Sequence, residues 1–177
     1  YTYYQIGLQL AVSKNQDYLK STILSNIGEI YRELNDYDSA IDLYQMSIAG
    51  LSEEKDLDRK IYPLSNIAAV YLAQKNYNKA EEYALLSLDL ARQCQDKIVE
   101  SVSLKYLGII ACEQHHYNQA IEFLNKSLSI YSETKEILLS MEVLFELHQV
   151  YRDQNDINHA LIYLNEIILN AEQINAD

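Results

Sequence analysis

The side chains that could carry out chemistry are few in this chain. The candidates are four histidines and two cysteines: His115, His116, His148, His159, Cys94 and Cys112. Adjacent histidines diverge on ordinary backbone, and the two cysteines lack the paired spacing of a zinc site or a redox motif. The sequence also contains no glycine-rich phosphate loop and no nucleophile signature. We therefore expect no enzyme, and no catalytic, cofactor-binding or metal-binding residues.

Charge and hydropathy narrow the possible partners. The net charge of −12 would repel a phosphate backbone, which argues against direct nucleic-acid binding. No apolar run approaches the roughly 18 to 20 residues that span a bilayer, so we expect no membrane insertion in this segment. The low cysteine content favours a reducing compartment such as the cytoplasm, although localisation stays open.

The elements that position the remaining side chains repeat every forty residues. The phrase NDYDSAIDLY (35–44) returns as KNYNKAEEYA (75–84), HHYNQAIEFL (115–124) and NDINHALIYL (155–164). Glycine and proline are too rare for a protein of strands and turns. In the first complete unit Leu24, Ile27, Gly28 and Tyr31 follow the i, i+3, i+4, i+7 spacing of an amphipathic helix, and a second such stripe follows Tyr37. Each unit therefore reads as a helical hairpin.

Aligned units show which positions are used for packing. Three columns stand out: the small residues Gly28, Ala68, Gly108 and His148; the alanines Ala40, Ala80, Ala120 and Ala160; and the second-helix openers Tyr37, Tyr77, Tyr117 and Ile157. Alanine in all four units predicts a helix crossing too close for a larger side chain. His148 therefore reads as a packing variant. His115 and His116 are expected at an exposed turn, and His159 on an exposed helix face.

These columns resemble the tetratricopeptide repeat (TPR), in a version longer than the family's usual period of about 34 residues. The resemblance implies an all-α, right-handed superhelical solenoid of antiparallel hairpins with about nine helices. We expect one domain over 1–177, with repeats at 17–56, 57–96, 97–136 and 137–177. Residues 1–16 would be the second helix of a truncated repeat, which suggests a fragment of a longer protein. Pro63 predicts a helix start or a bend near Tyr62.

The resemblance also implies a noncatalytic module that binds a protein or peptide in a concave groove lined by the first helices. The groove residues predicted from the non-core positions are Asn26, Glu29, Arg32, Tyr62, Asn66, Leu72, Lys105, Tyr106, Ile109, Phe145 and Arg152. Asparagine amides can both donate to and accept from a peptide backbone. The alternative is a sensing domain of a transcription or two-component signalling regulator, since similar lengthened repeats occur in peptide-sensing regulators.

The last predicted helix departs from the pattern on its outer face. Positions 42, 82 and 122 are acidic, whereas the fourth unit has Ile162, and Leu169 lies on the same face seven residues later. Exposed apolar surface is costly to leave in water. We predict that this C-terminal contact face is covered, first by a further helix of a longer protein or else by self-association with a second copy of the chain; plain exposure is the remaining alternative.

Overall fold

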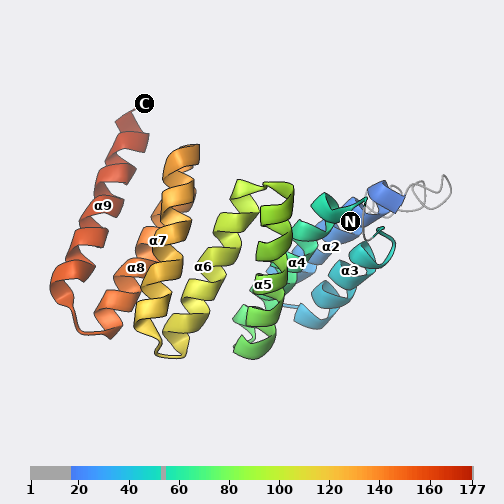
Figure 1. The fold of residues 1–177 in the computed structure, drawn as a ribbon, viewed down its shortest axis with the longest axis horizontal. Coiled ribbons are helices and arrows are strands. Elements are labelled where there is room, and N and C mark those ends of the chain that lie inside the picture. Colours follow the sequence, from blue (N-terminus) through green and yellow to red (C-terminus); the bar gives the residue numbers. More distant parts are fainter. Residues whose placement is uncertain (1–16, 53–54, 177) are drawn as a thin grey trace. The chain divides into compact units, whose positions relative to one another are not determined.

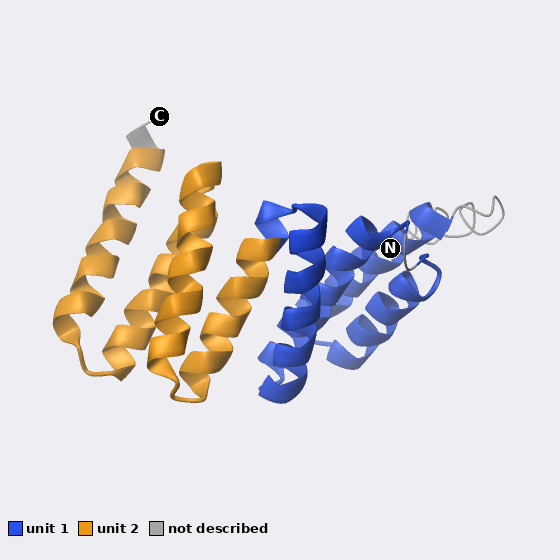
Figure 2. Ribbon diagram, viewed as in Figure 1, with its two compact units in different colours: residues 1–99 blue, residues 100–177 orange. Residues whose placement is uncertain are grey.

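A computed structural model describes residues 17–52 and 55–176 of the chain, which form eight α-helices and no strand (Figure 1). The chain divides into two compact units, residues 1–99 and 100–177 (Figure 2). Unit 1 contains α2 (Asp17–Glu33), α3 (Tyr37–Ala49), α4 (Leu57–Ala73) and α5 (Tyr77–Cys94). Unit 2 contains most of α6 (Lys97–Glu113), then α7 (Tyr117–Thr134), α8 (Ile137–Asp153) and α9 (Ile157–Ala176).

The helices keep the forty-residue register of the sequence. The first helix of each hairpin begins at Asp17, Leu57, Lys97 or Ile137, at intervals of forty residues. Consecutive helices α2 to α5 of unit 1 pack in turn, as do α7, α8 and α9 of unit 2. The all-α hairpin fold is therefore confirmed. The predicted helix at 1–16 lies outside the described residues.

One detail of α4 differs from the sequence-based expectation. The helix begins at Leu57 and passes through the buried Pro63, so the alternative in which a helix starts near Tyr62 is wrong. Pro63 lacks the N–H that would bond to the carbonyl of Arg59, and its ring crowds that same carbonyl. Because that carbonyl lies in the first turn, helix formation elsewhere in α4 outweighs one missing bond.

The turns between helices explain how the hairpins close. Asn35, Lys75, His115 and Asn155 all adopt a left-handed backbone with φ of 57° to 62°. Each turn carries the paired backbone bonds of a Schellman motif; in the first, the Asp36 N–H donates to the Tyr31 carbonyl at 2.9 Å. These bonds satisfy the last carbonyls of the first helix, and the chain reverses within three residues.

The packing columns lie where the sequence places them. The four alanines at 40, 80, 120 and 160 are at most 3% exposed. A Cβ added to Gly28 would lie 2.8 Å from the Tyr44 ring, and one added to Gly108 would lie 2.6 Å from Leu124 Cγ. The small column therefore exists because a large side chain of the partner helix fills the space above it.

Buried serines form a further column, and their hydroxyls hydrogen-bond from one helix of a hairpin to the other. Ser127 Oγ donates to the Ser101 carbonyl at 2.9 Å, while Ser101 Oγ donates to the Ser127 carbonyl at 2.8 Å. In unit 1, Ser87 Oγ donates to the Ile61 carbonyl at 3.2 Å. A buried hydroxyl without a partner would destabilise the fold, so these bonds make a small polar residue suitable at these two crossings.

Candidate functional site

Unit 1 contains an open pocket of about 390 Å³ between α2 and α4, here called the unit 1 pocket. Its lining includes three of the predicted groove residues, Asn26, Tyr62 and Asn66. Asn26 and Tyr62 are exposed, and Asn66 is half-buried. The forty-residue register places the two asparagines at equivalent points of neighbouring helices. Their amides therefore face one space, in which both could contact the same bound chain.

Two aromatic rings give the unit 1 pocket its walls. The guanidinium of Arg59 lies 4.4 Å from the centre of the Tyr18 ring and also pairs with Asp56. Tyr62 is 52% exposed. Partial burial, and then the nearby Asp96 carboxylate, raise the pKa of the Tyr62 phenol.

Unit 2 contains a more apolar pocket of about 480 Å³, here called the unit 2 pocket. Four of the predicted groove residues line it: Lys105, Tyr106, Ile109 and Phe145. Phe145 is 49% exposed, which leaves its ring available to a bound side chain. Side chains of three helices, α6, α8 and α9, thus surround one apolar space.

Acidic side chains outnumber basic ones at the unit 2 pocket. Lys105 Nζ binds Glu142 Oε2 at 2.5 Å and lies 5.7 Å from the centre of the Tyr106 ring. Glu146 lines the same pocket, and desolvation by burial raises the pKa of its carboxyl despite the opposing effect of Lys105. The pocket therefore combines an apolar wall with an acid whose burial a bound cation would offset.

The other predicted groove residues line neither pocket. Glu29 accepts hydrogen bonds from Arg32 and from the Tyr44 hydroxyl, the latter at 2.9 Å. The Tyr44 hydrogen bond joins α3 to α2, whereas the Arg32 contact lies within α2. Leu72 is half-buried, and Arg152 is exposed and pairs with the adjacent Asp153 at 3.3 Å.

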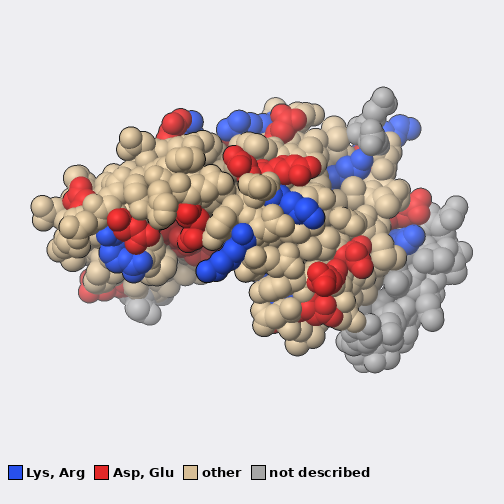
Figure 3. Space-filling model, turned by 90° about the horizontal axis from the view of Figure 1, so that it is seen from below, with Lys and Arg blue, Asp and Glu red and all other residues tan. Residues whose placement is uncertain are grey.

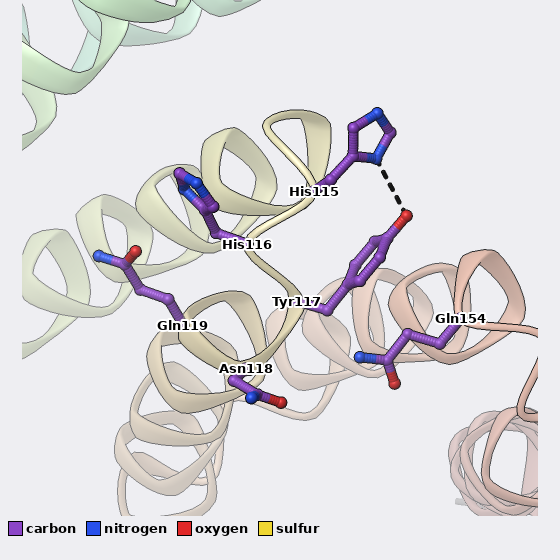
Figure 4. Close-up of a pocket in the computed structure, with 6 residues that line it drawn as sticks. All are labelled: His115, His116, Tyr117, Asn118, Gln119 and Gln154. Carbon is purple, nitrogen blue, oxygen red and sulfur yellow. Dashed lines mark hydrogen bonds between the residues drawn. The ribbon is translucent and has the colours of Figure 1, made fainter.

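The histidines occupy turn and packing positions. Figure 4 shows the rings of His115 and His116 pointing apart, with His115 Nδ1 3.0 Å from the Tyr117 hydroxyl. Both are exposed, as predicted for an exposed turn, and they line an open pocket of about 470 Å³. His148 Nδ1 lies 2.9 Å from the Ala160 carbonyl, which gives the small-column histidine a partner on the next helix. His159 is exposed on α9, and its Nδ1 lies 2.6 Å from Asp156 Oδ2.

Several pocket residues were not anticipated from sequence. They belong mainly to the first turns of the first helices: Tyr18, Asp58, Arg59, Leu138 and Met141. The predicted groove residues begin after the first turn of each first helix, so residues of that first turn were left out. Tyr18 and Leu138 stand in the same repeat column and are 56% and 67% exposed. Large apolar residues in this column, at the start of a helix, could have indicated that the first turn also lines the pocket.

Ile162 and Leu169 lie exposed on α9, at 58% and 64%. The prediction of an apolar outer face on this helix therefore corresponds to real exposed surface in unit 2. Figure 3 shows one face of the molecule, on which most lysines and arginines lie beside acids. Among the described residues, no group of histidine, cysteine or acidic side chains has the arrangement to hold a metal ion. None of the described helices combines the length and apolar character needed to cross a membrane.

Tandem helical hairpins with small, alanine and aromatic columns define a helical repeat scaffold. The chain belongs to the tetratricopeptide repeat family: models described as "Tetratricopeptide repeat" match residues 23–58 and 61–133. A search of curated protein sequences finds no match.

Solved structures of the same fold cover nearly the whole chain. RapI in its apo form has a TM-score of 0.86 at 19% identity, over 98% of this chain and 63% of RapI. Aspartyl phosphate phosphatase F from Bacillus subtilis has a TM-score of 0.83 at 16% identity, over 90% of this chain and 42% of the phosphatase. A Rap protein complexed with competence and sporulation factor has a TM-score of 0.75 at 16% identity, over 90% of this chain and 44% of that one. The chain therefore spans less than two thirds of each of these neighbours, and the likeness establishes the fold.

Proposed function

We propose that this chain is a noncatalytic protein-interaction module that binds a peptide or helix of another protein through the pockets on its first helices. The observation that carries the proposal is the unit 2 pocket, where Tyr106, Ile109 and Phe145 surround an open apolar space beside Lys105. Aromatic anchors in such spaces supply most of the binding energy at protein interfaces. TPR arrays expose surfaces of this kind along their first helices.

The chemistry of the unit 2 pocket indicates its occupant. An apolar or aromatic side chain would fill the space beside Phe145, because apolar contact there removes exposed ring surface from water. A lysine or arginine next to it in the partner would face Glu142 and Glu146, which Lys105 alone does not neutralise. We therefore propose an apolar anchor flanked by a basic residue as the preferred motif.

The unit 1 pocket would contribute backbone recognition. Asn26 and Asn66 can each donate to a carbonyl and accept from an N–H of an extended peptide. Tyr62 adds an exposed ring with a polar tip, a residue type enriched at interfaces. This pocket would hold a partner in place with less dependence on its sequence than the unit 2 pocket.

The experiment selects 12-residue peptides from a random displayed library on the purified chain and measures their affinity by fluorescence anisotropy. Tyr106→Ala or Phe145→Ala should raise the Kd about thirtyfold, the usual cost of removing a central anchor. The matched control is Leu86→Ala, since Leu86 is 45% exposed on α5 and lines neither pocket. Melting temperatures should stay within a few degrees of the parent. Unchanged affinity in both pocket variants would contradict the proposal, as would a parallel loss of folding and binding.

The alternative function is that of a sensing domain in a transcription or two-component signalling regulator. One observation favours it: a structural neighbour is a Rap protein solved in complex with competence and sporulation factor. In that case the pockets would take an effector peptide, and binding would change the activity of an adjoining output domain. A helix-turn-helix or kinase core in the same reading frame would support this function over a simple adaptor.

A further inference from the structure

The outer face of α9 carries an apolar patch centred on one polar residue. Leu161, Ile162, Ile168 and Leu169 are 49%, 58%, 48% and 64% exposed, and Asn165 between them is exposed as well. Helical periodicity places all five on one side of α9. The same side of α9 carries no lysine or arginine, because the described part of this helix has none. This patch is termed the α9 face.

Earlier repeats show what a following hairpin would cover. At the hairpin junctions inside each unit, the equivalents of Leu161 are Ile41 and Ile121, which are buried and half-buried where α4 packs on α3 and α8 packs on α7. The remaining equivalent, Glu81, is half-buried on α5. The equivalents of Ile162 are Asp42 and Glu122, which stay exposed at those junctions.

Leu169, like Ile162, stands where earlier units have exposed residues. The equivalents of Leu169 are Ala49 and Ser129, and both are exposed. Ile48 and Leu128, the equivalents of Ile168 within the two units, are half-buried. A further repeat stacked like the earlier ones would therefore cover Leu161 and Ile168 but leave Ile162 and Leu169 in water. The α9 face is wider than the surface that repeat stacking uses, so its occupant has a different geometry.

The spacing of the α9 face indicates that geometry. Leu161 and Leu169 lie four residues before and after Asn165, and Ile162 and Ile168 lie three residues before and after it. The same residue type therefore recurs at equal distances on both sides of one centre. A two-fold axis through Asn165 would place Leu161 against Leu169 and Ile162 against Ile168 of an antiparallel copy. Self-complementary surfaces of this kind form isologous dimers.

We propose that the α9 face is a homodimerisation surface, on which α9 of a second copy of this chain packs antiparallel about an axis at Asn165. The two asparagine amides would meet at the axis and hydrogen-bond to each other, as polar residues in helix seams do to fix the register. The same axis sets Glu172 opposite Asn158, which can donate to the carboxylate, rather than opposite another acid. Contact between the two α9 faces removes their apolar side chains from water, and this burial stabilises the dimer.

The test measures mass in solution for the 177-residue chain by sedimentation equilibrium over a concentration series. The expected wild-type species at high concentration has twice the 20.5 kDa mass of the chain. Leu169→Glu should weaken the dimer about a hundredfold or more, since symmetry buries the new charge twice. Leu34→Glu is the matched control, because Leu34 is 69% exposed in the turn after α2, and it should leave the dimer intact.

A cysteine pair tests the register. Asn165→Cys should form a disulfide-linked dimer under mild oxidation, because the two residues meet at the axis. Asn158→Cys, on the same exposed side of α9, should not, since the two copies would lie about 21 Å apart along the helices. The wild-type chain sets the background from the half-buried Cys94 and Cys112.

Each remaining outcome overturns the proposal. A wild-type chain that stays monomeric at high concentration would leave the α9 face to a different partner. A dimer that survives Leu169→Glu, or that Leu34→Glu also dissociates, would place the interface elsewhere. Equal cross-linking at positions 158 and 165 would indicate a parallel arrangement and exclude the axis at Asn165.

Discussion

Replacement of Gly108 by alanine should destabilise the chain even though alanine is the better helix former. The new Cβ would lie 2.6 Å from Leu124 Cγ, 2.8 Å from Leu124 Cδ2 and 3.3 Å from the Ala120 carbonyl oxygen. Leu124 is fully buried, so its branched carbon has no open space to move into. The backbone oxygen of Ala120 belongs to α7 and is held by that helix. The clash therefore has to be relieved by movement of packed groups.

The magnitude follows from two opposing effects. Alanine in place of glycine within a helix gains about 1 kcal/mol. Overpacking a close-packed core costs about 1 to 3 kcal/mol, and the branched Leu124 places this site toward the upper part of that range. Gly108→Ala should therefore lower the free energy of unfolding by about 1 to 2 kcal/mol. Leu124→Ala alone should lower it by about 3 kcal/mol, because it leaves a cavity.

The sign of the effect should reverse in the double variant. Once Leu124 is alanine, the clash is gone, and adding Gly108→Ala should raise stability by about 1 kcal/mol, a coupling of about 2 to 3 kcal/mol. The second repeat supplies the natural precedent, since Ala68 and Ala84 hold the equivalent positions and both are fully buried. Urea unfolding followed by far-UV circular dichroism measures the cycle.

A control separates this clash from a general response to alanine. Gly50 has a right-handed backbone, and a Cβ there would meet nothing within 4 Å. Gly50→Ala should therefore have the same small effect in the wild-type and Leu124→Ala backgrounds. If Gly108→Ala also has the same sign in both backgrounds, the steric explanation of the small column is refuted.

Three further predictions concern single residues. Lys75→Gly should raise the melting temperature, with a gain of about 0.5 to 1 kcal/mol, because φ is 57° at that turn; a lower melting temperature would contradict this. The hydrogen bond from Arg32, and then that from Tyr44, outweigh burial and lower the pKa of Glu29. The ionised Glu29 therefore stabilises the fold fully above its unfolded pKa of about 4.5, and this stabilisation is lost as pH falls through the lower folded pKa. The free energy of unfolding of Glu29→Gln, measured in urea, should therefore depend less on pH in that acid range than that of the wild type. Burial, then nearby acids, raise the pKa of the Cys112 thiol to about 11. Its alkylation at neutral pH, measured by mass spectrometry, should therefore be about a hundredfold slower than that of a free thiol. Fast labelling would show that the site opens.

The fold could be predicted because packing constraints recur in every repeat. Ala40, Ala80 and Ala120 are each fully buried, and the matching turn residues share one left-handed backbone conformation. Four instances of one position act as independent readings of the same steric requirement. At Pro63 the sequence left a helix start and a bend open, because a single proline carries no such repetition.

The pockets could be predicted only in part. Tyr106, Ile109 and Phe145 were found because a first helix has one side that packing does not use. Glu29 and Arg32 occupy the same kind of position, but the Tyr44 hydroxyl reaches across from α3 and joins them to the core. Periodicity gives the direction of a side chain from its own helix. It does not give the length of the side chain that approaches from the next one.

The α9 face shows why departures from a repeat pattern carry functional information. A packing position must satisfy the same neighbour in every unit, so it varies little, as the alanine column does. Ile162 and Leu169 replace exposed polar or small residues of earlier units, and no neighbour in unit 2 covers them. Packing within the chain does not require them, and exposure alone would disfavour them. Ile162 pairs with Ile168, and Leu169 with Leu161, at equal distances from Asn165, as expected of a surface that matches itself in a second copy.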